Sequence, residues 1–470
     1  MTYDYDLICI GSGPGGQRGA VQAAKLGKRV AIIEKQRDVG GDCLHTGTIP
    51  SKTFRESVLA FSRIANGLNS GTAYVRGVKS NGRGKPDAGE LFGRVSNIVE
   101  REVSVMDDQL TRNDVEIIAG TASFADPHTL NIESEDGTRP ITGENILVTV
   151  GTRPSPPATF SVDGQFVLTS DEIFKIEEIP RSVIVIGCGV IGIEYASMLA
   201  ALGVNVTVVD GRQRPLEFLD HEIIDELVHQ MRDKGVLFRL GETVESVNVK
   251  HNGRSTVVIS LESGKRLAAD LALICAGRVG ATDTLNLDAA GLMADDRGRL
   301  TVDENFRTAV PHIYAAGDVI GYPSLAATSS EQGRLAACAA FGVNAKPMSK
   351  HFPIGVYSVP EVSMVGAPEH ELTEQKVPYE TGVARFREIA RGHILGDKTG
   401  FLKMTFHRED RRLLGVHAIG TGATELIHIG QCAYGLGGGL DYFLETVSNY
   451  PTLAECYKVA ALDAHNKLLL

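Results

Sequence analysis

The sequence lacks the features that mark membrane-spanning, secreted and nucleic-acid-binding proteins. No stretch approaches the roughly 18 apolar residues that a helix needs to cross a bilayer. The N-terminus, MTYDYDLICIGSG, has two aspartates and only a short apolar run, so we expect no signal peptide. Acidic residues outnumber basic ones by 58 to 47, which argues against a general affinity for nucleic acid or anionic lipid.

Paired cysteines are also missing. The seven cysteines are odd in number, scattered, and show neither CxxC nor zinc-ligand spacing: Cys9, Cys43, Cys188, Cys275, Cys338, Cys432 and Cys456. This pattern predicts a reduced, cytoplasmic protein without a metal site. Apart from Cys43, we expect these cysteines to be buried and inert in apolar strands and helices.

What the sequence does contain is one pattern that occurs twice, 176 residues apart (187 minus 11). Each copy is an apolar strand, a glycine turn, a helix and a second strand that ends in an acidic residue. Glycines permit a tight turn, the helix N-terminus faces a pyrophosphate, and the acid accepts hydrogen bonds from a ribose diol. The repeat predicts an α/β fold with two Rossmann-like domains. The first copy has Gly11, Gly13, Gly16 and Glu34, and the second has Gly187, Gly189, Gly192 and Asp210.

The stretch after the first copy gives two weaker predictions. Residues 66–90 are polar and rich in glycine, which predicts an exposed loop. Apolar residues then recur at the spacing of one helix face, which predicts a helix packed on the core. These residues are Val95, Val99, Val103, Met106 and Leu110.

Two further segments complete a family pattern. NILVTVGTRP contains Gly151, and TAVPHIYAAGDVIGYPS places Asp318 after a strand. Together with the opening segment, they resemble the flavoprotein disulfide reductase family over essentially the whole chain. The resemblance implies an FAD-binding domain at 1–150 and 275–347, an NAD(P)-binding domain at 151–274, and an α+β dimerisation domain at 348–470. It also implies a homodimer or larger homo-oligomer.

The same resemblance assigns the cofactor-binding residues. For FAD they are Gly11, Gly13, Gly16, Glu34, Gly41, Lys52, Gly151 and Asp318. For NAD(P) they are Gly187, Gly189, Gly192, Asp210, Arg212, Arg214 and Gly277. Asp210 favours the free ribose diol of NAD, and the two arginines would offset its charge with hydrogen bonds to the extra phosphate of NADP. Alternatively, the arginines lie on a solvated turn.

The chain departs from the family at two positions of one chemical step. In VGGDCLHTGTIPSK, Cys43 is kept, but Thr48 stands where a second cysteine would complete a redox pair. In SNYPTLAEC, Tyr450 stands in the place of the family's histidine base, although Glu455 is retained. A tyrosine with a pKa near 10 is a poor base at neutral pH. Electrons that reach the flavin are therefore not passed to a thiol.

The residues that handle hydride are retained. Lys52 and Glu194 match a pair that lies near the flavin on the nicotinamide side in the family, where a cation stabilises negative charge. The predicted reaction is a transhydrogenation, NADPH + NAD⁺ ⇌ NADP⁺ + NADH, in two steps through FAD. GTIPSK, GDVIGYPSLA, ELIHIGQ and NYPTLAE resemble the transhydrogenases of the family. The candidate catalytic residues are Lys52, Glu194, Tyr450, Glu455, Cys43 and Thr48.

Three alternatives stay open at this point. The chain could be an NAD(P)H dehydrogenase that discharges its flavin onto a quinone, a dye or oxygen. It could be a disulfide reductase if another thiol, for instance Cys456, reached Cys43. It could also be a flavin-binding sensor with little turnover. For Cys43 itself, we favour a neighbour of the flavin over a nucleophile.

Overall fold

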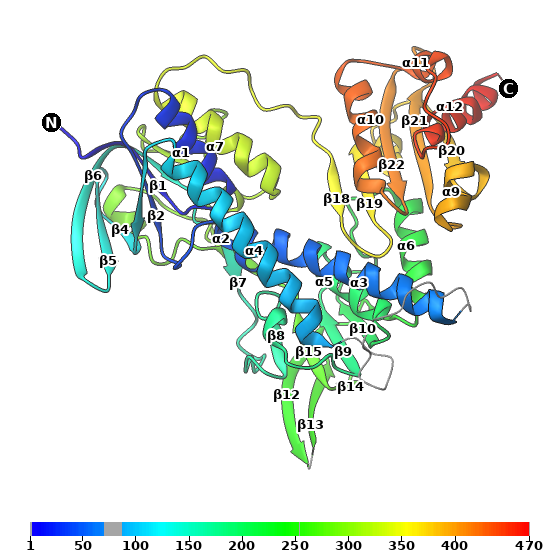
Figure 1. Ribbon diagram of the computed structural model, residues 1–470, viewed down its shortest axis with the longest axis horizontal. Coiled ribbons are helices and arrows are strands. Elements are labelled where there is room, and N and C mark those ends of the chain that lie inside the picture. The colour runs from blue at the N-terminus through cyan, green and yellow to red at the C-terminus, as the bar shows by residue number, and fades with distance from the viewer. Residues whose placement is uncertain (1, 70–86, 253, 470) are drawn as a thin grey trace.

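The computed structural model describes residues 2–69, 87–252 and 254–469, which form three units (Figure 1). The first unit contains a seven-stranded sheet whose parallel part runs β3-β2-β1-β6-β17. Its central strands are buried on both faces, as is typical of parallel sheets covered by helices. The long strand β6 also pairs with an antiparallel hairpin of β4 and β5. The strands are β1 (Tyr5–Ile10), β2 (Val30–Glu34), β3 (Val115–Ala119), β4 (Thr121–Asp126), β5 (Thr129–Ser134), β6 (Gly137–Val148) and β17 (Ile313–Ala315).

Five helices belong to this unit: α1 (Pro14–Lys25), α2 (Gly41–His45), α3 (Thr48–Asn69), α4 (Ala88–Thr111) and α7 (Ala326–Ala340). Helices α1 and α7 lie side by side (Figure 1), so close that a methyl group on Gly333 would overlap the carbonyl oxygen of Gly15. Helix α4 confirms the helix predicted from its apolar spacing. The predicted loop is wrong at its ends, because α3 continues to Asn69 and α4 begins at Ala88. Residues 70–86 of that prediction lie outside the described residues.

The second unit is a five-stranded parallel sheet in the order β11-β10-β9-β15-β8, extended by an antiparallel sheet of β12, β13 and β14. The chain enters and leaves this unit through two short strands, β7 (Thr152–Pro154) and β16 (Arg278–Gly280), which pair with each other. The other elements are β8 (Val167–Thr169), β9 (Ser182–Ile186), α5 (Val190–Ala201), β10 (Asn205–Asp210), α6 (His221–Asp233), β11 (Leu237–Leu240), β12 (Val244–Asn252), β13 (Arg254–Leu261), β14 (Arg266–Ala269) and β15 (Leu271–Ile274).

The third unit is an antiparallel sheet in the order β18-β19-β22-β21-β20, with α10 and α12 packed on one face. Its elements are β18 (Ile354–Val356), β19 (Val362–Gly366), α8 (Glu369–Glu374), β20 (Tyr379–Arg385), α9 (Ala390–Leu395), β21 (Phe401–His407), β22 (Leu413–Ile419), α10 (Ala423–Gly435), α11 (Leu440–Glu445) and α12 (Glu455–Leu468). The domain boundaries at 150, 274 and 347 stay predictions.

The other face of this third sheet packs against the second unit. Alternate residues of β21 point to opposite faces, so that Leu402 faces α10 and α12 while Phe401 joins a core shared with α3, α5 and α6. The shared core includes Phe54 of α3, Leu227 of α6 and Val362 of β19. The three units are therefore held together by continuous apolar packing.

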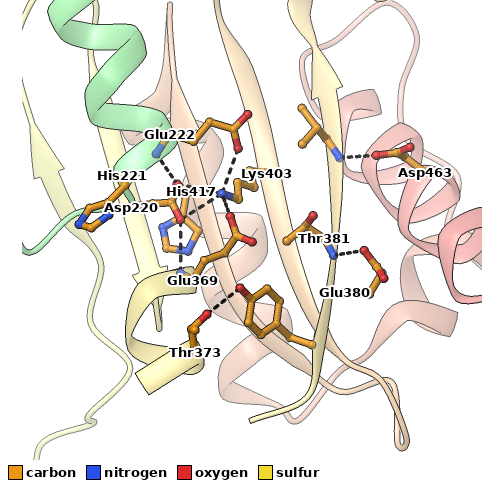
Figure 2. Close-up of polar contacts among 12 residues, drawn as sticks. Asp220, His221, Glu222, Glu369, Thr373, Glu380, Thr381, Lys403, His417 and Asp463 are labelled. Carbon is orange, nitrogen blue, oxygen red and sulfur yellow. Dashed lines mark hydrogen bonds and ion pairs between the residues drawn. The ribbon is translucent and has the colours of Figure 1, made fainter. Parts of the chain in front are cut away.

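Lys403 of β21 lies on this second face and is only 1% exposed (Figure 2). Its ammonium lies 2.9 and 3.2 Å from the two carboxylate oxygens of Asp220, which caps α6. Glu222 of α6, at 3.0 Å, and Glu369 of α8 also contact it. These three carboxylates lie close enough together to hold a cation, and among the described residues that place is taken by Lys403. We call this cluster of Lys403, Asp220, Glu222 and Glu369 the lysine joint.

Candidate functional site

The three glycines of the first turn have three different structural roles. Gly11 has a φ of +98°, and a methyl group there would lie 2.6 Å from the carbonyl oxygen of Thr149. A methyl group on Gly16 would overlap the carbonyl oxygen of Gly11, so this glycine lets α1 approach β1. Gly13, at the start of α1, would meet no described atom within 4 Å. The turn is thus closed around its base and open where a helix N-terminus offers amide groups to phosphate.

Glu34 closes this first site at the end of β2. Its carboxylate accepts hydrogen bonds from the amide and the hydroxyl of Ser12, at 3.0 and 2.6 Å, and from the amide of Gln36, at 2.9 Å. The Ser12 hydroxyl in turn accepts from the amide of Gly40. Glu34 is 5% exposed and its donors are all uncharged. The carboxylate keeps acceptor capacity for a ribose diol. Ser12 was not among the predicted residues, because nothing in a glycine motif distinguishes a serine that bonds a distant acid.

The second turn repeats the backbone of the first. Gly187 has a φ of +111°, and a methyl group on Gly192 would overlap the carbonyl oxygen of Gly187. The difference lies above Gly189, where a methyl group would lie 3.9 Å from the guanidinium of Arg212. A cation therefore stands beside the open side of this turn.

Arg212 holds the acid of the second site. Its Nε and Nη2 donate to the two carboxylate oxygens of Asp210, at 3.0 and 2.7 Å, and the amide of Cys188 donates at 2.7 Å. Burial opposes ionisation of Asp210, but these hydrogen bonds, above all those from Arg212, hold its pKa well below the usual range. Arg214 points elsewhere, to Asp225 of α6 at 2.5 Å. The structure thus brings Arg212, but not Arg214, to the predicted acid.

A cavity of about 280 Å³ opens beside this second turn. It lies at the carboxyl ends of β9 and β10, where ligands of open α/β sheets bind. Among its lining residues are Gly187, Asp210, Glu242, Phe160 and Gly277. The predicted acid and two of the predicted glycines therefore border one hollow.

The segment with Cys43 packs directly on the first turn. Gly41 has a φ of +57°, and a methyl group there would lie 3.0 Å from the Cα atom of Gly13. Burial raises the pKa of the Cys43 thiol, although hydrogen bonding from the Thr48 side chain acts in the other direction. The two side chains are thus neighbours, as the family's pair spacing requires, but only one of them is a thiol. A thiol with a raised pKa stays protonated at neutral pH and is a poor nucleophile.

Lys52 and Glu194 form the predicted pair. The ammonium of Lys52, on α3, lies 2.8 Å from a carboxylate oxygen of Glu194, on α5. The second oxygen of Glu194 accepts from the amide of Tyr357, and the Tyr357 ring lies 5.0 Å from the ammonium. The Glu194 side chain is 4% exposed and that of Lys52 is 26% exposed, so the cation faces solvent on one side. Tyr357, from the third unit, was not predicted.

Arg278 joins the first two units at the crossing strands. Its guanidinium donates to Asp42 beside Cys43 and to Asp171 of the second unit, both at 2.9 Å. It also donates to the carbonyl oxygen of Thr152 on the paired strand. Burial raises the pKa of Asp318, and the charge of Arg278 partly opposes this effect. This ion cluster adjoins the predicted flavin site, and no sequence motif predicted it.

The residues present fit a flavin. The hydroxyl of Thr46, between α2 and α3, is buried and has no hydrogen-bond partner among the described residues. Gly151 lies between β6 and β7 and has a φ of +67°. A methyl group added there would have no described atom within 4 Å. Open backbone at Gly13 and Gly151 and an unpaired hydroxyl at Thr46 suit a ligand rich in hydrogen-bonding groups.

Tyr450 and Glu455 lie apart from this cluster. Tyr450 is 73% exposed, and α12, which begins at Glu455, lies in the third unit away from α2 (Figure 1). One carboxylate oxygen of Glu455 is buried without a partner among the described residues. Cys456 is fully buried in α12, apart from Cys43 in α2, and burial raises its pKa to about 12. Cys432, in contrast, is exposed and Cys275 is half-buried, so the expectation that both are buried is wrong.

None of the described helices combines the length and apolar character that a membrane span requires.

Two family models match the chain. Residues 5–333 match the pyridine nucleotide-disulphide oxidoreductase model, and residues 352–461 match the dimerisation domain of the same family.

Curated relatives match over the whole length. A protein from Mycobacterium bovis named soluble pyridine nucleotide transhydrogenase is 49% identical over 99% of this chain and 98% of its own length. One of the same name from Colwellia psychrerythraea is 43% identical, with 99% of each chain covered. Among solved structures, LpdA from Mycobacterium tuberculosis has a TM-score of 0.88 at 26% identity, covering 97% of this chain and 99% of its own. The flavoprotein disulfide reductase RclA from Escherichia coli has a TM-score of 0.87 at 26% identity, with the same coverage. The chain belongs to the pyridine nucleotide-disulphide oxidoreductase family and is an oxidoreductase.

Proposed function

We propose that the protein is an FAD-dependent transhydrogenase that catalyses NADPH + NAD⁺ ⇌ NADP⁺ + NADH in two half-reactions, without a redox-active disulfide. The observation that carries the proposal is a contrast within α2 and α3. Lys52 keeps its ion pair with Glu194, whereas Thr48 occupies the place of a second thiol beside Cys43. The full-length relatives named as transhydrogenases support the same conclusion.

Lys52 and its neighbours would serve the hydride step. Bound FAD supplies a two-electron store that accepts hydride from one nicotinamide and returns it to another. Glu194 and the ring of Tyr357 hold the Lys52 ammonium in place, so that a positive charge stands ready where negative charge develops. Because Lys52 is half-buried, its charge is screened less than that of a surface lysine.

Thr48 and Tyr450 account for the absence of thiol chemistry. A hydroxyl cannot form a disulfide with Cys43, and burial keeps the Cys43 thiol protonated. Tyr450 stands in the place of the family's histidine, so the base that would activate a thiol is missing. Electrons would therefore leave through the same nicotinamide site by which they entered.

Asp210 and Arg212 would let one site accept both coenzymes. Asp210 can accept a hydrogen bond from the ribose diol of NAD⁺ while it remains paired with Arg212. With NADPH, the exposed guanidinium of Arg212 can turn to the 2′-phosphate and offset the charge of Asp210. The ion pair thus contains one partner for each coenzyme.

We further propose that the protein is a homodimer that forms through the third unit, in the cytoplasm. The family's dimerisation domain covers residues 352–461, and this region exposes several large apolar side chains. They include Ile429, Leu436, Tyr442, Val447 and Tyr450. Burial against a second copy would explain this exposure.

An anaerobic stopped-flow experiment tests the function. The purified holoenzyme is reduced with one equivalent of NADPH, mixed with NAD⁺ and followed by flavin absorbance and NADH fluorescence. We expect the flavin to reoxidise as NADH forms, and we expect no reaction with lipoamide or glutathione disulfide. A flavin that stays reduced with NAD⁺ but is rapidly reoxidised by a quinone would contradict the proposal and indicate an NAD(P)H dehydrogenase.

A further inference from the structure

Two arginines on residues 211–219 are each paired with a separate acid. Arg212 pairs with Asp210 at the end of β10, and Arg214 pairs with Asp225 on α6 at 2.5 Å. The four side chains carry no net charge together. Arg212 lies beside Gly189 of the nucleotide turn, whereas Arg214 is held at α6.

Arg214 is nevertheless close to the nucleotide turn along the backbone. Its carbonyl oxygen lies 3.9 Å from the sulfur of Cys188, which directly follows the first glycine of that turn. The Arg214 side chain is 35% exposed and that of Asp225 is 66% exposed, so neither is locked by packing. Rotation about the bonds of its long side chain can free the guanidinium from Asp225, and its backbone already lies beside the turn that borders the cavity.

Asp225, in contrast, lies on a fixed element. Helix α6 is capped by Asp220, and the lysine joint binds this cap to β21 of the third unit (Figure 2). Arg214 also donates to the carbonyl oxygen of His221, in the first turn of the same helix. Asp225 is carried by an anchored helix, whereas Arg214 reaches it from a loop through a long side chain, so the arginine is the partner that moves when both of its bonds to α6 break.

We propose that Asp225 is a specificity-determining residue of the nicotinamide site, because it competes with the 2′-phosphate of NADP(H) for Arg214. A phosphate monoester carries more than one negative charge at neutral pH and binds arginine through two hydrogen bonds. NADP(H) must draw Arg214 away from Asp225, whereas NAD(H), with a free diol, leaves the pair intact. Asp225 thus lowers the affinity for one coenzyme only. The inference rests on the proposed use of both coenzymes at this site.

The test removes the charge of Asp225 without a change of shape. Binding of NADP⁺ and NAD⁺ to the oxidised FAD holoenzyme is measured by titration calorimetry for the parent protein and for Asp225→Asn. We expect the dissociation constant of NADP⁺ to fall about two- to five-fold, the range that an exposed ion pair allows, while that of NAD⁺ is unchanged. Glu226→Gln is the matched control, since it removes the same charge from the neighbouring position of α6, where Glu226 bonds Gln230.

Each outcome decides the inference. An unchanged ratio of the two dissociation constants, or an equal change in Glu226→Gln, overturns it. So does a shift that persists when Asp225→Asn is combined with Arg214→Ala, because the effect is then not transmitted through Arg214. Absence of NADP⁺ binding to the parent protein also overturns it. Calorimetry of the oxidised enzyme involves no turnover, so a failure of the transhydrogenase proposal would appear in the stopped-flow experiment and not in this ratio.

Discussion

The two glycine turns share a backbone but differ in how the acid at the end of the second strand is held. In the first unit, Glu34 is buried and receives its hydrogen bonds from Ser12 and from backbone amides. In the second unit, Asp210 is held by Arg212, whose side chain is 47% exposed. An enclosed acid with neutral donors suits a cofactor that stays bound. A charged, partly exposed pair suits ligands that exchange and differ by one phosphate.

We expect the largest effect on ligand binding when a methyl group is added to the third glycine of each turn. In Gly16→Ala and Gly192→Ala, the new methyl would overlap the carbonyl oxygen of the first glycine. We expect Gly16→Ala to be purified without flavin. We expect Gly192→Ala to keep its flavin but to bind both coenzymes about 10- to 100-fold more weakly, as overpacking of one site predicts. Flavin absorbance of the purified proteins and coenzyme titrations measure the two effects; loss of flavin from both variants would show that the turns are not independent.

Removal of the charged donor from the second site gives the next largest effect. In Arg212→Ala, Asp210 loses its partner and repels the 2′-phosphate, so the dissociation constant of NADP⁺ is expected to rise about 10-fold or more. That of NAD⁺ should change little. The corresponding change in the first site, Ser12→Ala, should weaken flavin retention without any difference between the coenzymes. Equal weakening of NAD⁺ and NADP⁺ in Arg212→Ala would contradict the role given to this arginine.

Salt sharpens the comparison with a smaller effect. The Debye length falls from about 10 Å at 0.1 M to about 3 Å at 1 M salt, so the exposed charges of the second site are screened. We expect NADP⁺ affinity to fall several-fold over this range and NAD⁺ affinity to fall less. Flavin should stay bound, because Glu34 and its donors are buried. Release of flavin at the same salt concentrations would show that the charges of the first site are screened as strongly as those of the second.

Acid should produce the smallest difference. The pKa of Asp210 is lowered in the folded protein, so its stabilising contribution is present above the unfolded pKa and is lost as the pH falls below about 4. Since Arg212 is partly exposed, we expect a contribution of at most about 1 kcal/mol. Chemical unfolding of the parent and of Asp210→Asn at pH 7 and pH 3.5 measures it. The difference between their free energies of unfolding should be smaller at pH 3.5 than at pH 7. A larger difference at pH 3.5 would show that the pKa of Asp210 is not lowered in the folded protein.

Local patterns in the sequence predicted the backbone of both turns, because glycine spacing follows directly from the close approach of a strand and a helix. The Lys52–Glu194 pair joins residues 142 positions apart, and only the family resemblance could predict it. Ser12, Tyr357 and Arg278 were missed. The partner of Ser12 is 22 positions away, and those of Tyr357 and Arg278 are 163 and 236 positions away, so the contacts depend on how the chain folds back on itself.

Two placements depend on surroundings that the sequence does not specify. Arg214 was predicted at the phosphate site because it is near Asp210 in sequence, but the position of α6 brings Asp225 closer. Cys432 was predicted to be buried because its helix is apolar, but it lies on the exposed face of α10. Helical spacing indicates which residues share a face, and it does not identify what covers that face.

The lysine joint limits which segments could be exchanged between this protein and its relatives in a chimera. The ammonium of Lys403 is neutralised by Asp220 and Glu222 of the second unit and by Glu369 of its own unit. Suppose that α6 and its cap were replaced by a segment without Asp220. The buried ammonium of Lys403 would then lose its best partner, which would lower the free energy of unfolding by about 3–5 kcal/mol. The second unit therefore cannot be exchanged independently of the third unit. A chimera that exchanges α6 and its cap must therefore also exchange Lys403 of β21, so that the buried charge at this contact stays balanced.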